Sequence, residues 1–287
     1  MSIISLDDKE IRYQVSQVKE LPPLPLSLRR LIEIIYSEIE TPGELESIIH
    51  YDPPLVAKIL MVANSTYYGF RRKVDSLSKA ITLIGADQVK SICIYSLLIN
   101  QISSGHMISA AHRETLWKHA FASSRIAGEM TRRRPWMGRN EASVLGLLHD
   151  LGWIVMAAYF NEQFVAIFET AARRKIPPWC VETQYGLEHC RLGKYLASRW
   201  ALPEIFEAVM EFHHYPEKSG SFGTEVRFIY LVNILSHSLE YPELVNEDTT
   251  LSRCRDLYIS EDEWQECQES VETIRPEIDQ LWSLLGG

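Results

Sequence analysis

The sequence has little cysteine and no excess of basic residues. Five cysteines occur in 287 residues and none forms a CxxC pair, so neither a disulfide framework nor a structural zinc knuckle is expected. The formal net charge is −9 and the pI is about 5.5, which leaves no basic surplus to neutralise phosphates. Broad binding to nucleic acid or to an anionic membrane is therefore not expected.

The chain also lacks a secretion signal and long apolar runs. Its N-terminus, MSIISLDDKEIRYQ, has no basic-then-apolar pattern, and no window reaches the ~18 uninterrupted apolar residues of a membrane span. Scattered cysteines fit a reducing compartment. With 46% hydrophobic and 23% charged residues, the composition predicts a soluble cytoplasmic protein without a membrane partner.

Helix signals recur along the chain and strand signals do not. Asp52 precedes two prolines and the run LVAKILMVAN, and Ser76 precedes LSKAITLIG, so both are expected to be helix N-caps. Gly85 can close the second of these helices in the left-handed conformation. Asn140 is expected to cap a helix that contains the stretch GLLHDLGW. These patterns predict an all-α protein built as a multi-helix bundle.

Several of the nine histidines fall at interior or terminal positions of expected helices. His119 lies mid-helix, His149 and Asp150 end an apolar helix, His189 is expected one turn into a new helix, and His213 and His214 end another. Imidazoles and a carboxylate from several helices are the usual donors of a metal site inside a helical bundle. Such donors suit iron, manganese or zinc. A carboxylate can also bridge two cations, which could stabilise both oxygens of a phosphoryl displacement.

Each of these residues also has a purely structural interpretation. A histidine on an apolar helix is commonly a hydrogen-bonded core residue, and His149 at a helix C-terminus could simply favour the helix dipole. The pair His213 and His214 could end its helix in solvent. The ordered occurrence of all of them is harder to explain by chance, and it favours a binding cavity.

The order of motifs resembles the HDOD family, bacterial signalling-output domains related to HD hydrolases. The resemblance covers about residues 15–240: LPPLP and a helix, then IIHYDPPLVAKILMVANSTYYG, SLSKAITLIGADQVKSIC, LWKHAFASSRIA, GLLHDLGWIVM and EHCRLGKYLASRWALPEIFEAVMEFHH. It implies an HD-like helical bundle with an N-terminal helical subdomain. We expect an N-terminal extension (1–14), the N-terminal subdomain (15–108), an HD-like core (109–240) and a C-terminal helical extension (241–287).

The resemblance also implies metal ligands. A first site would use His119, His149, Asp150 and, weakly, Asn233, which stands where catalytic relatives have an aspartate. A second site would use Asp150, His189, His213 and His214. Together they imply one bound transition metal, which would be iron, manganese or zinc.

Departures from the hydrolase pattern favour a non-catalytic protein. Asn233 offers a neutral amide instead of a carboxylate, and Trp153 replaces a lysine that often follows the HD motif, which removes a cation that would stabilise a phosphoryl group. The GYP signature is absent after His214. The sequence thus predicts a regulatory protein with a protein partner in a signalling pathway. The alternative is a metal-dependent phosphohydrolase that acts on a nucleotide or another phosphoester, and in that case Asp150 would be the catalytic residue.

Two basic clusters leave nucleic-acid binding as a third interpretation. FRRK (residues 70–73) and RRRPWMGR (residues 132–139) have aromatic residues within or beside them, as base stacking requires. Against a net charge of −9, solvated basic turns are the simpler interpretation, and nucleic-acid binding is not expected.

Overall fold

The computed structural model describes residues 26–35, 42–66, 68–103, 108–133, 137–238 and 241–285. Over these residues the regular elements are α-helices and short 3₁₀ turns, without strands, which confirms the predicted all-α fold. The N-terminal extension (1–14) and the proline-rich entry LPPLP lie outside the described residues.

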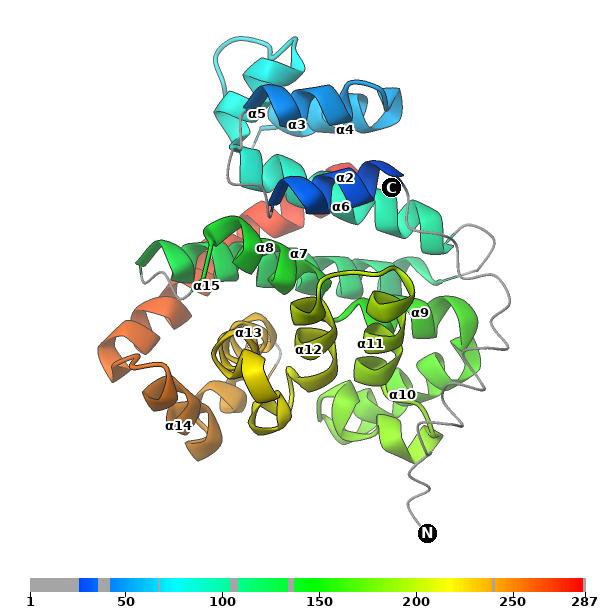
Figure 1. The fold of residues 1–287 in the computed structure, drawn as a ribbon, viewed down its shortest axis with the longest axis vertical. Helices are drawn as coiled ribbons and strands as arrows, with labels where there is room; N and C mark the ends of the chain where they lie inside the picture. Colours follow the sequence, from blue (N-terminus) through cyan, green and yellow to red (C-terminus); the bar gives the residue numbers. More distant parts are fainter. Residues whose placement is uncertain are drawn as a thin grey trace.

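The N-terminal helices form one end of the molecule, with α3, α4 and α5 outermost and α2 and α6 beneath them (Figure 1). They are α2 (Leu26–Ile35), α3 (Pro42–Ile49), α4 (Pro53–Ala63), α5 (Leu77–Ile84) and α6 (Ala86–Ser103). Their shared interior is apolar: side chains such as Leu31, Ile49 and Ile59 are fully buried. Burial of these faces stabilises helices that would be too short to persist alone in water.

Local signals in the sequence set the ends of two of these helices. The Asp52 carboxylate accepts the Leu55 backbone N–H at 3.1 Å, and the Ser76 hydroxyl accepts that of Lys79 at 3.4 Å, which confirms both predicted N-caps. Gly85 ends α5 with a φ of 96°, a positive value that glycine tolerates, although its ψ of 143° is extended and not left-handed helical.

The HD-like core lies below α6 in Figure 1, and the candidate site histidines lie within or at the ends of its helices. They are α7 (Ala110–Arg133), α8 (Arg139–Leu148), α9 (Leu151–Tyr159), α10 (Asn161–Arg174), α11 (His189–Arg199), α12 (Glu204–Phe212) and α13 (Gly223–His237). Short 3₁₀ turns connect them: η1 (Pro178–Cys180), η2 (Glu182–Tyr185), η3 (Pro216–Lys218) and η4 (Gly220–Phe222). The long helix α7 packs against α8, α13 and the C-terminal helix, so it lies between the N-terminal helices and the rest of the core.

The stretch from α8 to α9 is a long, largely apolar segment. Residues 141–159 are long and apolar enough to cross a membrane, but 89% of the apolar window is buried inside the fold, as expected for a core segment. Asn140 was expected to cap α8, and this prediction is wrong. The N-cap is Gly138, without a side-chain cap, and the acidic Glu141 lies in the first turn, where it complements the helix dipole.

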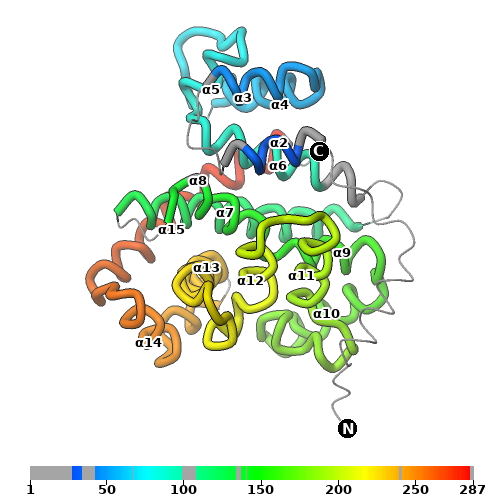
Figure 2. Tube along the Cα trace, viewed as in Figure 1, coloured from blue at the N-terminus to red at the C-terminus, as the bar shows by residue number. Residues whose placement is uncertain are grey.

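The C-terminal extension joins the two halves of the molecule. After η5 (Pro242–Asn246) and α14 (Asp248–Asp256), α15 (Glu261–Leu285) runs back toward the N-terminal helices (Figure 2). It packs on α7, α13 and α4. The buried Glu277 accepts hydrogen bonds from Gln88 of α6 and, at 3.2 Å, from Arg125 of α7. Since α15 touches both halves, it fixes the N-terminal subdomain against the core.

Candidate metal centre

Two histidines from α7 and the end of α8 meet inside the core. His119 lies in the middle of α7, as predicted. The Ser236 hydroxyl donates its hydrogen to the His119 backbone carbonyl at 3.3 Å, so its oxygen accepts the Nδ1–H of His119 at 3.0 Å. His149 donates its Nδ1–H to the Gly146 carbonyl at 2.8 Å. The two Nε2 atoms therefore present lone pairs inward, 3.2 Å apart.

A second pair of histidines comes from α11 and the end of α12. His189 donates from Nδ1 to Glu182 Oε2 at 2.7 Å, and the same oxygen accepts its backbone N–H at 2.9 Å. His213 donates from Nδ1 to the Val209 carbonyl at 3.0 Å, and its Nε2 lies 3.2 Å from that of His189. His189 was expected one turn into its helix. It is instead the first residue of α11, because the Glu182 carboxylate satisfies its otherwise unpaired N–H.

Asp150 lies between the two pairs, at the junction of α8 and α9. Its Oδ2 lies 3.1 Å from His119 Nε2 and 3.5 Å from His149 Nε2. Its Oδ1 lies 3.2 Å from the Nε2 atoms of both His189 and His213. Among the described residues no hydrogen bond of good geometry reaches Oδ1, although the atom is buried. A buried carboxylate oxygen that faces imidazole nitrogens and accepts no hydrogen bond is suited to bind a cation.

The distances fit a metal ion on either side of Asp150. Donors that bind one tetrahedral ion at about 2.0–2.2 Å lie roughly 3.3–3.6 Å from one another, and in octahedral geometry about 3 Å. The first position is defined by His119, His149, Asp150 Oδ2 and Asn233, whose Oδ1 lies 3.3 Å from His149 Nε2. The second position is defined by Asp150 Oδ1, His189 and His213. All six of these predicted residues converge, from α7, the α8–α9 junction, α11, the end of α12, and α13.

The electrostatics of the two positions differ. Burial lowers the pKa of His149 to about 3, so this imidazole is neutral and can bind a metal. At the second position burial opposes charge on His213, but Cys190 and the Asp150 carboxylate together raise its pKa to about 9. Burial likewise opposes ionisation of Asp150, but the neighbouring histidines hold its pKa well below the usual range. The negative groups of the second position therefore favour positive charge there, either as protons on the imidazoles or as a metal ion that displaces those protons.

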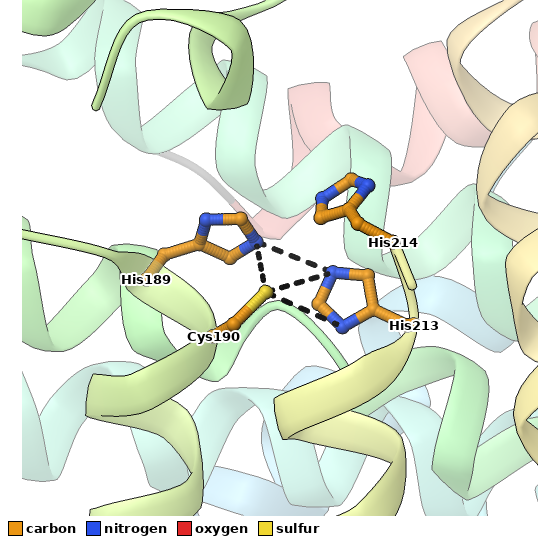
Figure 3. A group of neighbouring side chains, drawn as sticks. All are labelled: His189, Cys190, His213 and His214. Atoms are coloured by element: carbon orange, nitrogen blue, oxygen red, sulfur yellow. Dashed lines mark hydrogen bonds between the residues drawn. The ribbon is translucent and has the colours of Figure 1, made fainter. Parts of the chain in front are cut away.

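His214 and Cys190 lie beside the second position (Figure 3). The His214 ring centroid is 4.3 Å from that of His213, and its buried Nε2 has no hydrogen-bond partner among the described residues. Cys190 Sγ lies 3.4 Å from His189 Nε2 and 3.9 Å from His213 Nε2. Sequence reasoning included His214 but missed Cys190 and the anchor Glu182. The adjacent letters HC at residues 189–190 were the available signal for the cysteine.

Trp153 packs flat on one of the candidate ligands. Its indole stacks on the His189 ring at 4.4 Å with an interplanar angle of 10°, and the side chain is buried. An indole supplies no positive charge to a phosphoryl group, but here it holds the His189 ring in its plane. The residue thus supports the geometry of the second position.

Glycines allow the helices that bear these ligands to approach closely. A Cβ added to Gly152 would lie 1.8 Å from the His189 carbonyl oxygen, and one on Gly146 would lie 2.7 Å from the Ser123 carbonyl oxygen. Both clashes are with backbone, which cannot move aside as a flexible side chain can. Gly152 therefore sets the distance between α9 and α11, and with it the distance from Asp150 to His189.

A cavity of about 410 Å³ leads toward the first position from the surface between α7, α13 and α15. Its walls include His119, His237, Lys118 and Arg275. His237, which sequence reasoning also missed, stacks on the His119 ring at 4.0 Å. The side chain of His119 is 10% exposed, whereas those of His189 and His213 are fully buried. The first position is thus near solvent, and the second is enclosed.

Comparison with known proteins identifies the family. The sequence profile of the HDOD domain matches residues 21–216, which is more than half of the chain. The chain belongs to the HDOD domain family. A curated relative, an uncharacterized protein of Treponema pallidum (strain Nichols), is 25% identical over 202 residues, which are 69% of this chain and 38% of the relative. The chain thus spans well under half the length of that relative.

Solved structures agree with this fold. An HDOD domain protein of unknown function from Geobacter sulfurreducens matches with a TM-score of 0.78 and 22% identity, over 96% of this chain and 97% of the other. A proposed signal transduction protein from Marinobacter aquaeolei matches with a TM-score of 0.77 and 20% identity, over 99% of this chain and 67% of the other. A proposed phosphohydrolase from Shewanella amazonensis matches with a TM-score of 0.69 and 17% identity, over 99% of this chain and 100% of the other. At these identities the likeness shows that the HDOD and HD-like fold is shared.

Proposed function

We propose that this protein is a regulatory HDOD protein that binds a transition metal at the second position and catalyses no reaction. The observation that carries this proposal is Asp150 Oδ1, a buried oxygen that accepts no hydrogen bond from the described part of the chain and lies 3.2 Å from the Nε2 atoms of His189 and His213. Iron, manganese and zinc all accept this imidazole and carboxylate donor set. The bound cation would neutralise the buried carboxylate and hold α9, α11 and α12 together.

Three features support a role without catalysis. The ligands His189 and His213 are fully buried, so a substrate cannot reach the second position without rearrangement. The first position is near solvent, but Asn233 gives it a neutral amide oxygen, which binds a hard cation more weakly than a carboxylate does. Trp153 adds no positive charge beside either position.

The surface of the N-terminal subdomain supports a protein partner. Large apolar side chains are exposed on or between its helices: Tyr51 at 83%, Met61 at 42%, Phe70 at 36% and Leu83 at 45%. Exposed apolar side chains of this size are common at protein contact sites. Because α15 joins this subdomain to the core, a metal-dependent change in the core could reach the partner surface.

Metal content and thermal stability together test the proposal. Protein purified without chelator or affinity-column metal should contain a transition metal. Iron, manganese or zinc added to metal-free protein, at a hundredfold excess over the dissociation constant, should raise the melting temperature by at least about 5 °C. Asp150→Ala should abolish both effects, while Asp75→Ala, which removes an exposed carboxylate of the N-terminal subdomain, should keep them. Absence of metal and of any thermal shift in the unmodified protein would falsify the proposal.

A metal-dependent phosphohydrolase is the second candidate, and the cavity of about 410 Å³ favours it. The cavity leads to His119 and contains Lys118 and Arg275, which could contact a phosphate. Lys118 is already paired with Glu114 at 2.8 Å and Asp279 at 2.6 Å, however, which reduces its attraction for an anion. Turnover of nucleotides or cyclic dinucleotides with added metals, abolished by Asp150→Ala, would establish this alternative in place of the regulatory role.

Ion pairs at the second basic cluster weaken the case for nucleic-acid binding. Arg132 lies 2.5 Å from Glu129, and Arg133 lies 2.5 Å from Glu266 of α15. Paired in this way, these two arginines contribute less positive potential to a phosphate backbone. A protein partner and a cytoplasmic location stay part of the proposal.

A further inference from the structure

The cysteine next to His189 lies among metal-binding atoms. Donor atoms of His189, Cys190, His213 and His214 all lie within 4.8 Å of one another, and the cysteine is 7% exposed (Figure 3). The other buried cysteines, Cys93, Cys254 and Cys267, belong to no such group among the described residues. Cys190 is therefore distinguished by its neighbours and not by its burial.

The spacing is that of ligands around one ion. Zinc binds sulfur at about 2.3 Å and imidazole nitrogen at about 2.0–2.1 Å, so a sulfur and a nitrogen on one tetrahedral ion lie roughly 3.5 Å apart. Cys190 Sγ lies 3.4 Å from His189 Nε2 and 3.9 Å from His213 Nε2. Shifts of a few tenths of an ångström would bring these three donors to one ion.

The environment of the sulfur also favours a thiolate. Cys190 is the second residue of α11, where the helix dipole stabilises negative charge. His214 Nε2, buried and without a hydrogen-bond partner among the described residues, lies beside it as a further neutral donor. The three imidazoles of His189, His213 and His214 and one thiolate form a soft donor set rich in nitrogen and sulfur.

We propose that Cys190 is a thiolate ligand of the metal at the second position, which makes this position selective for zinc over manganese and magnesium. The inference rests on the proposed metal-binding function and adds to it the identity of the ligand and of the metal. Thiolate sulfur favours zinc, whereas a site of imidazole and carboxylate alone also accepts harder ions such as manganese.

Cobalt(II) substitution distinguishes this inference from the proposal on which it rests. Metal-free protein is titrated with cobalt and followed by its visible d–d bands, which report any bound cobalt. A near-ultraviolet thiolate-to-cobalt charge-transfer band reports sulfur coordination alone. The unmodified protein should show both signals, and zinc should displace the cobalt. Cys190→Ser should keep the d–d bands and lose the charge-transfer band, while Cys254→Ser, a buried cysteine of α14, should keep both.

Competition between metals gives the second measurement. The preference for zinc over manganese in the unmodified protein should fall by at least about tenfold in Cys190→Ser and stay unchanged in Cys254→Ser. Cobalt d–d bands without a charge-transfer band in the unmodified protein would overturn the role of Cys190 and leave the metal-binding function intact. Failure to bind cobalt, zinc or manganese at all would overturn both. Because the unmodified protein alone can give either result, the test does not depend on the stability of the serine variant.

Discussion

The two sides of Asp150 show how one carboxylate can serve two unlike environments. The first position has two imidazoles and the Asn233 amide, and a cavity of about 410 Å³ approaches it. The second has two fully buried imidazoles, with Cys190 and His214 beside them. Access and ligand strength are thus separated: beyond its imidazoles and the shared Asp150 carboxylate the accessible position adds only the neutral Asn233 amide, and the position with the stronger ligands lacks access. A catalytic site needs both together, whereas a structural or sensing metal needs only the second.

The change with the largest expected effect removes what the two positions share. Asp150→Ala deletes both carboxylate oxygens, so affinity for zinc should fall by at least about 100-fold at the second position and be undetectable at the first. Isothermal titration calorimetry of metal-free protein with zinc measures the affinities of both positions. If the variant binds zinc as tightly as the unmodified protein, Asp150 is not a ligand and the comparison of the two positions loses its basis.

A substitution at Gly152 should disturb the second position more than the first. Gly152→Ala places a Cβ 1.8 Å from the His189 carbonyl oxygen, so α11 must move away from α9. Overpacking of this kind should lower the free energy of unfolding by about 1–3 kcal/mol or more, as measured by urea denaturation. Gly138→Ala is the control, because its nearest neighbour would be at 3.8 Å. Equal stability of the two variants would show that the α9–α11 contact is looser than described.

Two anchors of the imidazole rings allow each position to be weakened separately. Glu182→Ala removes the carboxylate that accepts the His189 Nδ1–H. Ser236→Ala removes the hydroxyl that accepts the His119 Nδ1–H. Each should reduce metal affinity at its own position by about 10- to 100-fold, because such partners orient the ring and fix its tautomer. In titrations that resolve the two positions, an equal loss at both positions from either variant would contradict their independence.

The smallest expected effect is a gain. Asn233→Asp adds a carboxylate near His149 Nε2, where the amide oxygen now lies at 3.3 Å. Affinity for manganese at the first position should rise by about tenfold, as expected when a hard cation gains a charged oxygen ligand. Metal analysis of the variant should then find a second metal ion bound per protein molecule. No change in stoichiometry or affinity would mean that the amide is not what limits the first position.

Much of this candidate site could be predicted from sequence because its candidate ligands stand at helix positions that periodicity reveals. His119 lies mid-helix, and His149 with Asp150 joins two apolar helices, as expected. Glu182 could not be found in this way. It lies in the short 3₁₀ turn η2, seven residues before His189, and its role depends on how that turn folds back onto α11.

Other features depend on tertiary packing that no local pattern encodes. No second cysteine stands at metal-ligand spacing from Cys190, so no spacing pattern in the sequence indicated that it is a ligand. Its closeness to His213 arises only because α12 packs against α11 in the fold. The predicted Asn140 cap was wrong because α8 begins one residue before Asn140, at Arg139, with Gly138 as its N-cap. The link from α15 to α6 and α7 rests on Glu277, whose partners are far away in the sequence.

The central claim is that the second position holds a transition metal, and anomalous X-ray diffraction tests it most directly. Crystals of protein grown with zinc, measured on both sides of the zinc absorption edge, should show an anomalous peak bounded by Asp150 Oδ1, His189 Nε2 and His213 Nε2. That peak should be stronger than any between His119 and His149. No peak at either position, or a peak at the first position alone, would contradict the account.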